Sequence, residues 1–145
     1  MVNRIIEYLR LGRIFNAEIL ALLYVLTYIF TSELYSYQID YKIIAGLFVV
    51  GILSHIWGAY NNDRLDLCID KGADYCSHKP LVSGTISIKR AKIIEYSILL
   101  IIICIVLVMS PKLATLGYLF GAYLLAYLYN RYNKRCYIPC KHEYS

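Results

Sequence analysis

The amino-acid sequence predicts an all-α membrane protein with four transmembrane helices in two antiparallel hairpins. Two observations lead to this prediction. Hydrophobic residues fill 59% of the 145 positions, charged residues fill only 17%, and the mean hydropathy is +0.52. The apolar residues also gather into four runs of 17 or 18 residues, close to the roughly 20 that a helix needs to cross a bilayer. The remaining polar sequence is too short to cover a soluble helical bundle.

The first half of the chain is expected to hold an interfacial arm and the first hairpin. In residues 1–13, Ile5, Ile6 and Leu9 are interspersed with arginines and a glutamate, a pattern typical of a helix lying on a membrane surface. Two apolar runs, Ile14–Phe30 and Ile43–Tyr60, follow with a short polar link between them. Tyrosines and charges at their ends extend each run by about a turn. We therefore expect spans at about residues 14–31 and 43–62.

The second half is expected to form the second hairpin of a single domain over residues 1–145. A polar segment, residues 61–88, contains a turn at Ser83 and Gly84 and an N-cap at Ser87. The apolar runs Ile93–Met109 and Leu113–Tyr129 follow, separated by a short turn that contains a proline. This pattern predicts spans at about residues 89–109 and 113–130.

The distribution of positive charge predicts the orientation. Thirteen of the fifteen lysines and arginines lie in the N-terminal arm, the central segment with its flanks, or the C-terminal tail; only Lys42 and Lys112 lie on the opposite side. The positive-inside rule then places both termini and the central segment in the cytoplasm, with the protein integral to the cell membrane. Nucleic-acid binding is not expected, because it needs a basic soluble face.

Three carboxylates end the second apolar run. On a helix, Asp63, Asp66, Asp70 and the neighbouring Asn62 fall within one sector of about 100°. Because like charges at this spacing destabilise a helix, a cation is expected among them. Hard oxygen ligands suit Mg²⁺, which takes one or two carboxylates together with phosphate oxygens. With lysines following, the pattern favours a ligand with a phosphate head and a lipid tail; a solvated loop with incidental acids is the alternative.

This stretch resembles the first signature of the UbiA superfamily of intramembrane prenyltransferases. Asn62-Asp63-x-x-Asp66-x-x-x-Asp70 is similar to its N-D-x-x-D-x-x-x-D element, and the sequence from Lys79 to Ser87 is similar to the R-P-(L/I)-x-x-G-x-I-S element that follows. Lys79 stands where the family has an arginine, which keeps the charge but loses the bidentate fork.

The resemblance extends to both ends of the chain. Leu11–Asn16 is similar to the R-P-x-N start of the family's first helix, with Ile14 in place of the proline, and Tyr127–Arg135 is similar to the end of its fourth helix. The family has about nine helices and a second acidic motif. The chain therefore looks like the N-terminal half of a UbiA-type bundle, and we expect it to be inactive without the second half.

The resemblance implies a prenyltransferase of isoprenoid biosynthesis, which moves a prenyl group from a prenyl diphosphate to a lipophilic or aromatic acceptor with Mg²⁺. The alternative is a non-catalytic membrane protein that binds prenyl phosphates. Partners implied are membrane lipids and either a second chain supplying the missing half or a second copy of this chain. The implied catalytic residues are Asp63, Asp66 and Asp70; the metal ligands are these three with Asn62; and the substrate-binding residues are Arg13, Asn16, Asn62, Lys71 and Lys79.

Overall fold

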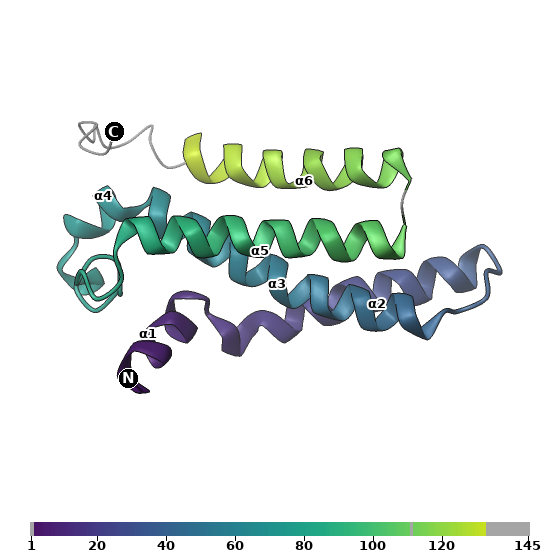
Figure 1. The fold of residues 1–145 in the computed structure, drawn as a ribbon, viewed down its shortest axis with the longest axis horizontal. Coiled ribbons are helices and arrows are strands. Elements are labelled where there is room, and N and C mark those ends of the chain that lie inside the picture. The colour runs from purple at the N-terminus through teal and green to yellow at the C-terminus, as the bar shows by residue number, and fades with distance from the viewer. Residues whose placement is uncertain (1, 111, 133–145) are drawn as a thin grey trace.

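The structure, a computed structural model, describes residues 2–110 and 112–132, and every regular element in this range is helical (Figure 1). The order is α1 (Val2–Leu11), η1 (Ile14–Asn16), α2 (Ala17–Leu34), α3 (Tyr41–Leu65), α4 (Leu67–Lys71), η2 (Asp74–Cys76), α5 (Ile88–Met109) and α6 (Leu113–Tyr132). The all-α prediction is confirmed. The helices run several residues past the apolar segments, because polar and aromatic residues at a membrane boundary continue the helical hydrogen bonding.

Three helical segments of the described chain are long and apolar enough to cross a membrane: Ile14–Leu34, Tyr41–Leu65 and Ile88–Met109. The fourth predicted span corresponds to α6, which is 20 residues long. Its five tyrosines, with Asn130 and Arg131, lower its hydropathy, and it is not among these three segments. Three membrane-spanning helices are therefore supported by length and composition, and the fourth span remains a prediction.

α3 is the central helix and packs against α2, α5 and α6 (Figure 1). Gly51 lets α2 approach closely, since a Cβ atom at this position would lie 2.4 Å from the Ala21 Cα. Val50 and Trp57 on α3 pack against Ile98 and Ile102 on α5 and form the core at mid-height of the bundle. Dispersion contacts and close backbone approach of this kind hold membrane helices together.

A second core lies where the helices meet the polar segment. Six buried apolar residues join α1, α3, α4, the loop after η2 and the start of α5: Leu11, Tyr60, Leu67, Leu81, Ile86 and Ala91. Burying a side chain such as Leu81 or Ile86 is worth about 1.5–3 kcal/mol. The loop is thus fixed by its own apolar residues. Two local predictions are confirmed: Gly84 has a φ of 74°, and Ser87 caps α5 by accepting a hydrogen bond from the Arg90 amide.

Large apolar side chains cover the outside of the long helices. Phe30 on α2 is 70% exposed, Val108 on α5 is 87% exposed and Phe120 on α6 is 71% exposed. An apolar surface of this extent is typical of helices that face lipid. The chain is an integral membrane protein.

Candidate functional site

The three aspartates lie at the junction of α3 and α4. α3 ends at Leu65, Asp66 forms the break and α4 begins at Leu67. The break is slight, because the Asp66 amide still donates to the Asn62 carbonyl and the Asp70 amide to the Asp66 carbonyl, each over 2.9 Å. All three aspartates are buried, with 5%, 6% and 8% of Asp63, Asp66 and Asp70 exposed. Buried carboxylates need hydrogen bonds and counter-charges.

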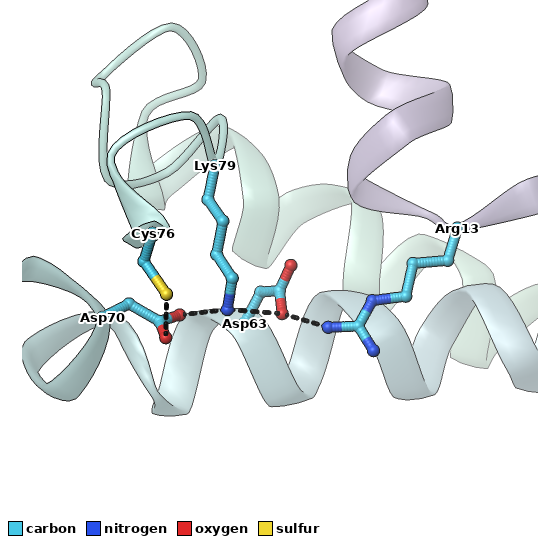
Figure 2. A network of polar contacts seen from close by, with 5 residues as sticks. All are labelled: Arg13, Asp63, Asp70, Cys76 and Lys79. Atoms are coloured by element: carbon cyan, nitrogen blue, oxygen red, sulfur yellow. Dashed lines mark hydrogen bonds and ion pairs between the residues drawn. The ribbon is translucent and has the colours of Figure 1, made fainter. Parts of the chain in front are cut away.

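Two cations from distant parts of the sequence supply those charges, as Figure 2 shows. The Arg13 Nη2 atom donates to Asp63 Oδ1 over 2.7 Å. The Lys79 Nζ atom donates to Asp70 Oδ2 over 2.7 Å and lies 3.8 Å from Asp63 Oδ1. Lys79 thus bridges two aspartates that are seven residues apart. The cation that the sequence pattern required is protein-derived in this structure.

The surroundings of Lys79 act on its pKa in opposite directions. Burial favours the neutral amine, but the hydrogen bond to Asp70 and the charges of Asp63 and Asp70 outweigh it, so the pKa of Lys79 is raised. The ammonium is therefore held in its charged form between the two carboxylates.

Cys76 is a member of the site that sequence reasoning missed. Its Sγ atom donates to Asp70 Oδ1 over 3.4 Å (Figure 2), and the residue is 2% exposed. Burial raises the pKa of the Cys76 thiol, and the hydrogen bond to Asp70 adds to this effect. A thiol in this state is a poor nucleophile. Its role here is to donate a weak hydrogen bond to a carboxylate.

The loop between η2 and α5 positions Lys79. The Lys79 amide donates to the Cys76 carbonyl over 2.9 Å, and the Ile86 amide donates to the Pro80 carbonyl over 3.1 Å. With Leu81 and Ile86 buried in the core beneath, the loop folds back over the end of α3. The residues that resemble the second family element are thus the ones that place a cation over the carboxylates.

Arg13 reaches the site from an unusual backbone conformation. It lies between α1 and η1 with φ 47° and ψ 41°, in the left-handed region. Such a conformation costs a residue with a Cβ atom about 1–2 kcal/mol. Packing holds it in place: Leu11 is 1% exposed, and the neighbouring Gly12 lies against α3, where an added Cβ would be 3.1 Å from the Ile56 Cγ2 atom.

The other predicted site residues lie further from the Arg13–Asp63–Lys79–Asp70 network. Asn62 is half-buried on α3, beside Asp63. Lys71, the last residue of α4, and Asn16, at the start of α2, are exposed. The Asn16 side chain makes no capping hydrogen bond. The structure therefore brings Arg13, Asp63, Asp70 and Lys79 into direct contact, and it does not bring Asn16 into that network.

The donor set suits Mg²⁺. Aspartate oxygens are hard ligands, and cations beside them can hold phosphate oxygens. Within residues 2–110 and 112–132, no three acidic, histidine or cysteine side chains lie close enough together to hold a metal ion by themselves. Mg²⁺ commonly binds through only one or two carboxylates, with water and substrate phosphates completing its coordination. The residues present fit such a site.

A second polar network that sequence reasoning missed lies on another side of α3. Glu95 on α5 is 2% exposed and accepts hydrogen bonds from Arg64 Nε over 2.7 Å and from Asn61 Nδ2 over 2.8 Å. Asn130 on α6 in turn donates to Asn61 Oδ1 over 3.0 Å. The sequence did indicate such a network, because Glu95 is an acid inside an apolar stretch, where a charge is costly and needs a partner.

A known protein family matches most of the chain. The model of the UbiA prenyltransferase family matches residues 21–140, a range that includes the three aspartates, Lys79 and Cys76 but not Arg13. Neither a search of curated proteins nor a search of solved structures returned a match. The match extends over most of the chain, which therefore belongs to the UbiA prenyltransferase family.

Proposed function

We propose that the carboxylate site at the end of α3 binds a prenyl diphosphate together with Mg²⁺, and that the chain contributes this site to a prenyltransferase. The observation that carries the proposal is the burial of three aspartates with two protein cations at the end of a membrane-spanning helix. A diphosphate needs cations and metal ligands at the membrane boundary, and a prenyl tail needs apolar surface beside them.

The ion pairs suggest how the ligand is accommodated. Asp63 and Asp70 each hold a cation that is long and flexible enough to turn toward a phosphate. Asp63 and Asp70 would hold Mg²⁺ in place of the guanidinium and the ammonium that they bind in this structure, which would free both cations for the diphosphate. Arg13 and Lys79 then donate to phosphate oxygens, where charge-assisted hydrogen bonds are strong. Asn62 and Asp66 complete the ligand set from the same helix end, and Lys71 and Asn16 are the outer candidates for contact with substrate.

The reaction follows from the ligand. The allylic C–O bond breaks and its electron pair leaves with the diphosphate; a nucleophilic carbon or oxygen of the acceptor bonds to the allylic carbon, and the acceptor loses a proton. Bound Mg²⁺ supplies Lewis-acid neutralisation of the departing charge. Arg13 and Lys79, once turned toward the diphosphate, stabilise the same charge. The loop that carries Lys79 is anchored by the buried Leu81 and Ile86, and it would limit the access of water to the breaking bond.

Prenyl transfer would also need a contribution from outside this cluster. Two metal ions commonly hold the two sides of a displacement on phosphorus or a phosphate leaving group, and the cluster on α3 and α4 supplies one side. A second copy of this chain, or another chain, would supply the other side. The purified chain alone is then expected to bind the diphosphate without transferring the prenyl group at an appreciable rate.

The carboxylate site would face the cytoplasm, as the charge distribution predicts. Tyr75 and Tyr37 lie in the segments at opposite ends of the long helices, and they are 81% and 68% exposed. In oriented cells, a cysteine introduced by Tyr75→Cys should react only after permeabilisation, and one introduced by Tyr37→Cys should react from outside. The reverse pattern would invert the topology.

Binding of a radiolabelled prenyl diphosphate to the purified chain, with Mg²⁺ and with EDTA, tests the function. Asp66→Asn should weaken Mg²⁺-dependent binding at least tenfold, because one unit of ligand charge is lost. Asp74→Asn is the matched control, because Asp74 is an exposed acid of the same segment. Binding that is indifferent to EDTA and to Asp66→Asn would refute the proposal. Binding without transfer, even when candidate partner chains are added, would favour the non-catalytic alternative.

A further inference from the structure

A cavity of about 360 Å³ lies between α3, α5 and α6, within the size range of small-molecule pockets. We call it the α5–α6 cavity. Its wall is largely apolar and aromatic, with Trp57 from α3, Leu99 and Ile103 from α5, and Leu119 and Tyr123 from α6. Tyr96 and Phe120, which are 60% and 71% exposed, also line it. The cavity therefore opens toward the lipid side of these two helices.

The lining residues give the cavity an elongated shape with one polar end. Arg64 lies seven residues after Trp57 on α3, which places it about 10 Å further along the axis. Glu95 and Ile103 are separated by eight residues on α5, or about 12 Å. Arg64 and Glu95 thus lie at the end near the polar segment, and the apolar residues extend toward the membrane interior. An amphiphile has this same division between head and tail.

The polar end retains hydrogen-bonding capacity. Arg64 donates through Nε and Nη2 to the two carboxylate oxygens of Glu95, over 2.7 and 3.1 Å. A guanidinium has five N–H donors, and among the described residues the Nη1 group of Arg64 has no protein acceptor. Glu95 accepts three hydrogen bonds, counting that from Asn61, whereas a carboxylate has about four acceptor positions. A ligand head that both accepts and donates would match these groups.

The charges at this end favour a neutral head. Arg64 and Glu95 form a buried ion pair with side chains 12% and 3% exposed, and their charges cancel. Arg131, whose Nη1 atom donates to the hydroxyl of the lining residue Tyr127, lies outside the cavity wall. An anionic head would meet the Glu95 carboxylate at short range in a poorly solvated place, which is unfavourable. A hydroxyl accepts from Arg64 and donates to Glu95 without this penalty.

The α5–α6 cavity is distinct from the carboxylate site. Arg64 and Trp57 share a face of α3 that is rotated about 100° from Asp63. No aspartate of the site lines the cavity. A ligand bound there would be separated from the aspartates by the α3 backbone, and it would need no metal ion.

We propose that the α5–α6 cavity binds a neutral amphiphile from the membrane, with its hydroxyl head between Arg64 and Glu95 and its aliphatic or isoprenoid tail against Trp57 and Ile103. This inference does not depend on the proposed function. Bound in this position, the amphiphile would join α6 to α5 and α3.

The sequence contains a single tryptophan, Trp57, so the native fluorescence reports on the cavity directly. The probe is a long-chain alcohol with a brominated tail, titrated into the purified chain in detergent and in phosphatidylcholine liposomes, since bromine quenches tryptophan at short range. The carboxylate with the same brominated chain tests the charge of the head. Ile103→Phe fills the cavity, and Ile101→Phe, which adds the same ring at a 48% exposed position of α5 that does not line the cavity, is the matched control.

We expect saturable quenching by the alcohol, tighter than by the carboxylate, that is weakened at least tenfold by Ile103→Phe and unchanged by Ile101→Phe. Arg64→Lys keeps the charge and removes the spare guanidinium donors, so it should weaken alcohol binding about two- to tenfold. EDTA and Asp66→Asn should have no effect, which separates this test from that of the carboxylate site. Quenching that does not saturate, or that is equal in the two phenylalanine variants, would overturn the proposal. Tighter binding of the carboxylate would overturn the assignment of a neutral head.

Discussion

The Arg64–Glu95 ion pair allows a quantitative test of how the helices are held together. Glu95→Gln keeps an oxygen that can accept from Asn61 but removes the charge that balances Arg64. The Arg64 side chain is only 12% exposed, so its guanidinium would be left largely desolvated without a counter-charge. Breaking a buried pair in this way costs about 3–5 kcal/mol. We expect the lower end, about 3 kcal/mol, because Arg64 retains some exposure and two of the hydrogen bonds can persist in neutral form.

The Arg64→Met/Glu95→Gln double variant separates the loss of the pair from the loss of packing. Removing the cation as well leaves no uncompensated buried charge, so the largest part of the penalty of Glu95→Gln disappears. The double variant should therefore be more stable than Glu95→Gln alone, although it carries one more change. The two substitutions should be non-additive by about 1–3 kcal/mol.

Thermal unfolding in detergent, followed by helical circular dichroism, is the measurement. For a chain of this length, about 3 kcal/mol corresponds to a decrease in Tm of roughly 6–12 °C. The reasoning fails if Glu95→Gln unfolds at the wild-type temperature, or if the double variant shows the sum of the two single effects. Either result would mean that water reaches the pair.

Two further predictions concern packing and charge. Gly51→Ala should destabilise the protein by more than about 1 kcal/mol, because the new Cβ would lie 2.4 Å from the Ala21 backbone. Gly117→Ala, with nothing within 4 Å, should not lower Tm, since alanine favours the helix more than glycine does. Equal Tm values for the two variants would contradict the close packing of α2 on α3. Lys79→Met should lower Tm at neutral pH, and the difference from wild type should shrink at alkaline pH. The raised pKa of Lys79 means that the folded state binds its proton more tightly than the unfolded state does. This stabilisation is therefore complete below the ordinary lysine pKa and is lost as the pH rises through the raised value. A Tm difference between the variant and the wild type that stays the same from pH 7 to pH 11 would contradict this account.

The features that depend on the spacing of neighbouring residues could be predicted from the sequence. Apolar runs located the long helices, Gly84 and Ser87 marked the turn and cap before α5, and the spacing of Asp63 and Asp70 placed both carboxylates at one site. The helix limits differed, since hydrogen bonding continues beyond the apolar run, to Leu34 in α2 and to Leu65 in α3. α6 is long enough to span a membrane, but its tyrosines lower its hydropathy, and it is not among the three candidate spans.

Contacts between distant residues could not be predicted in the same way. Arg13 and Asp63 are 50 residues apart and Arg64 and Glu95 are 31 residues apart, and no local periodicity links them. The sequence predicted that a cation should lie among the aspartates, but Lys79 was assigned to phosphate and not to Asp70. The contact between Cys76 and Asp70 was not predicted, because the spacing of the five cysteines does not indicate which carboxylate a thiol will contact.

The left-handed conformation of Arg13 has a consequence for which residues can occupy that position. Glycine or asparagine would relieve the backbone, but neither carries a positive charge to Asp63. Lysine would carry the charge and keep the same backbone cost while losing the planar fork. No single amino acid satisfies both demands, so a complete substitution scan should separate stability from ligand binding at this position. Glycine should relieve the backbone but leave Asp63 without its nearest counter-charge, so it should lower diphosphate affinity far more than it changes folding yield.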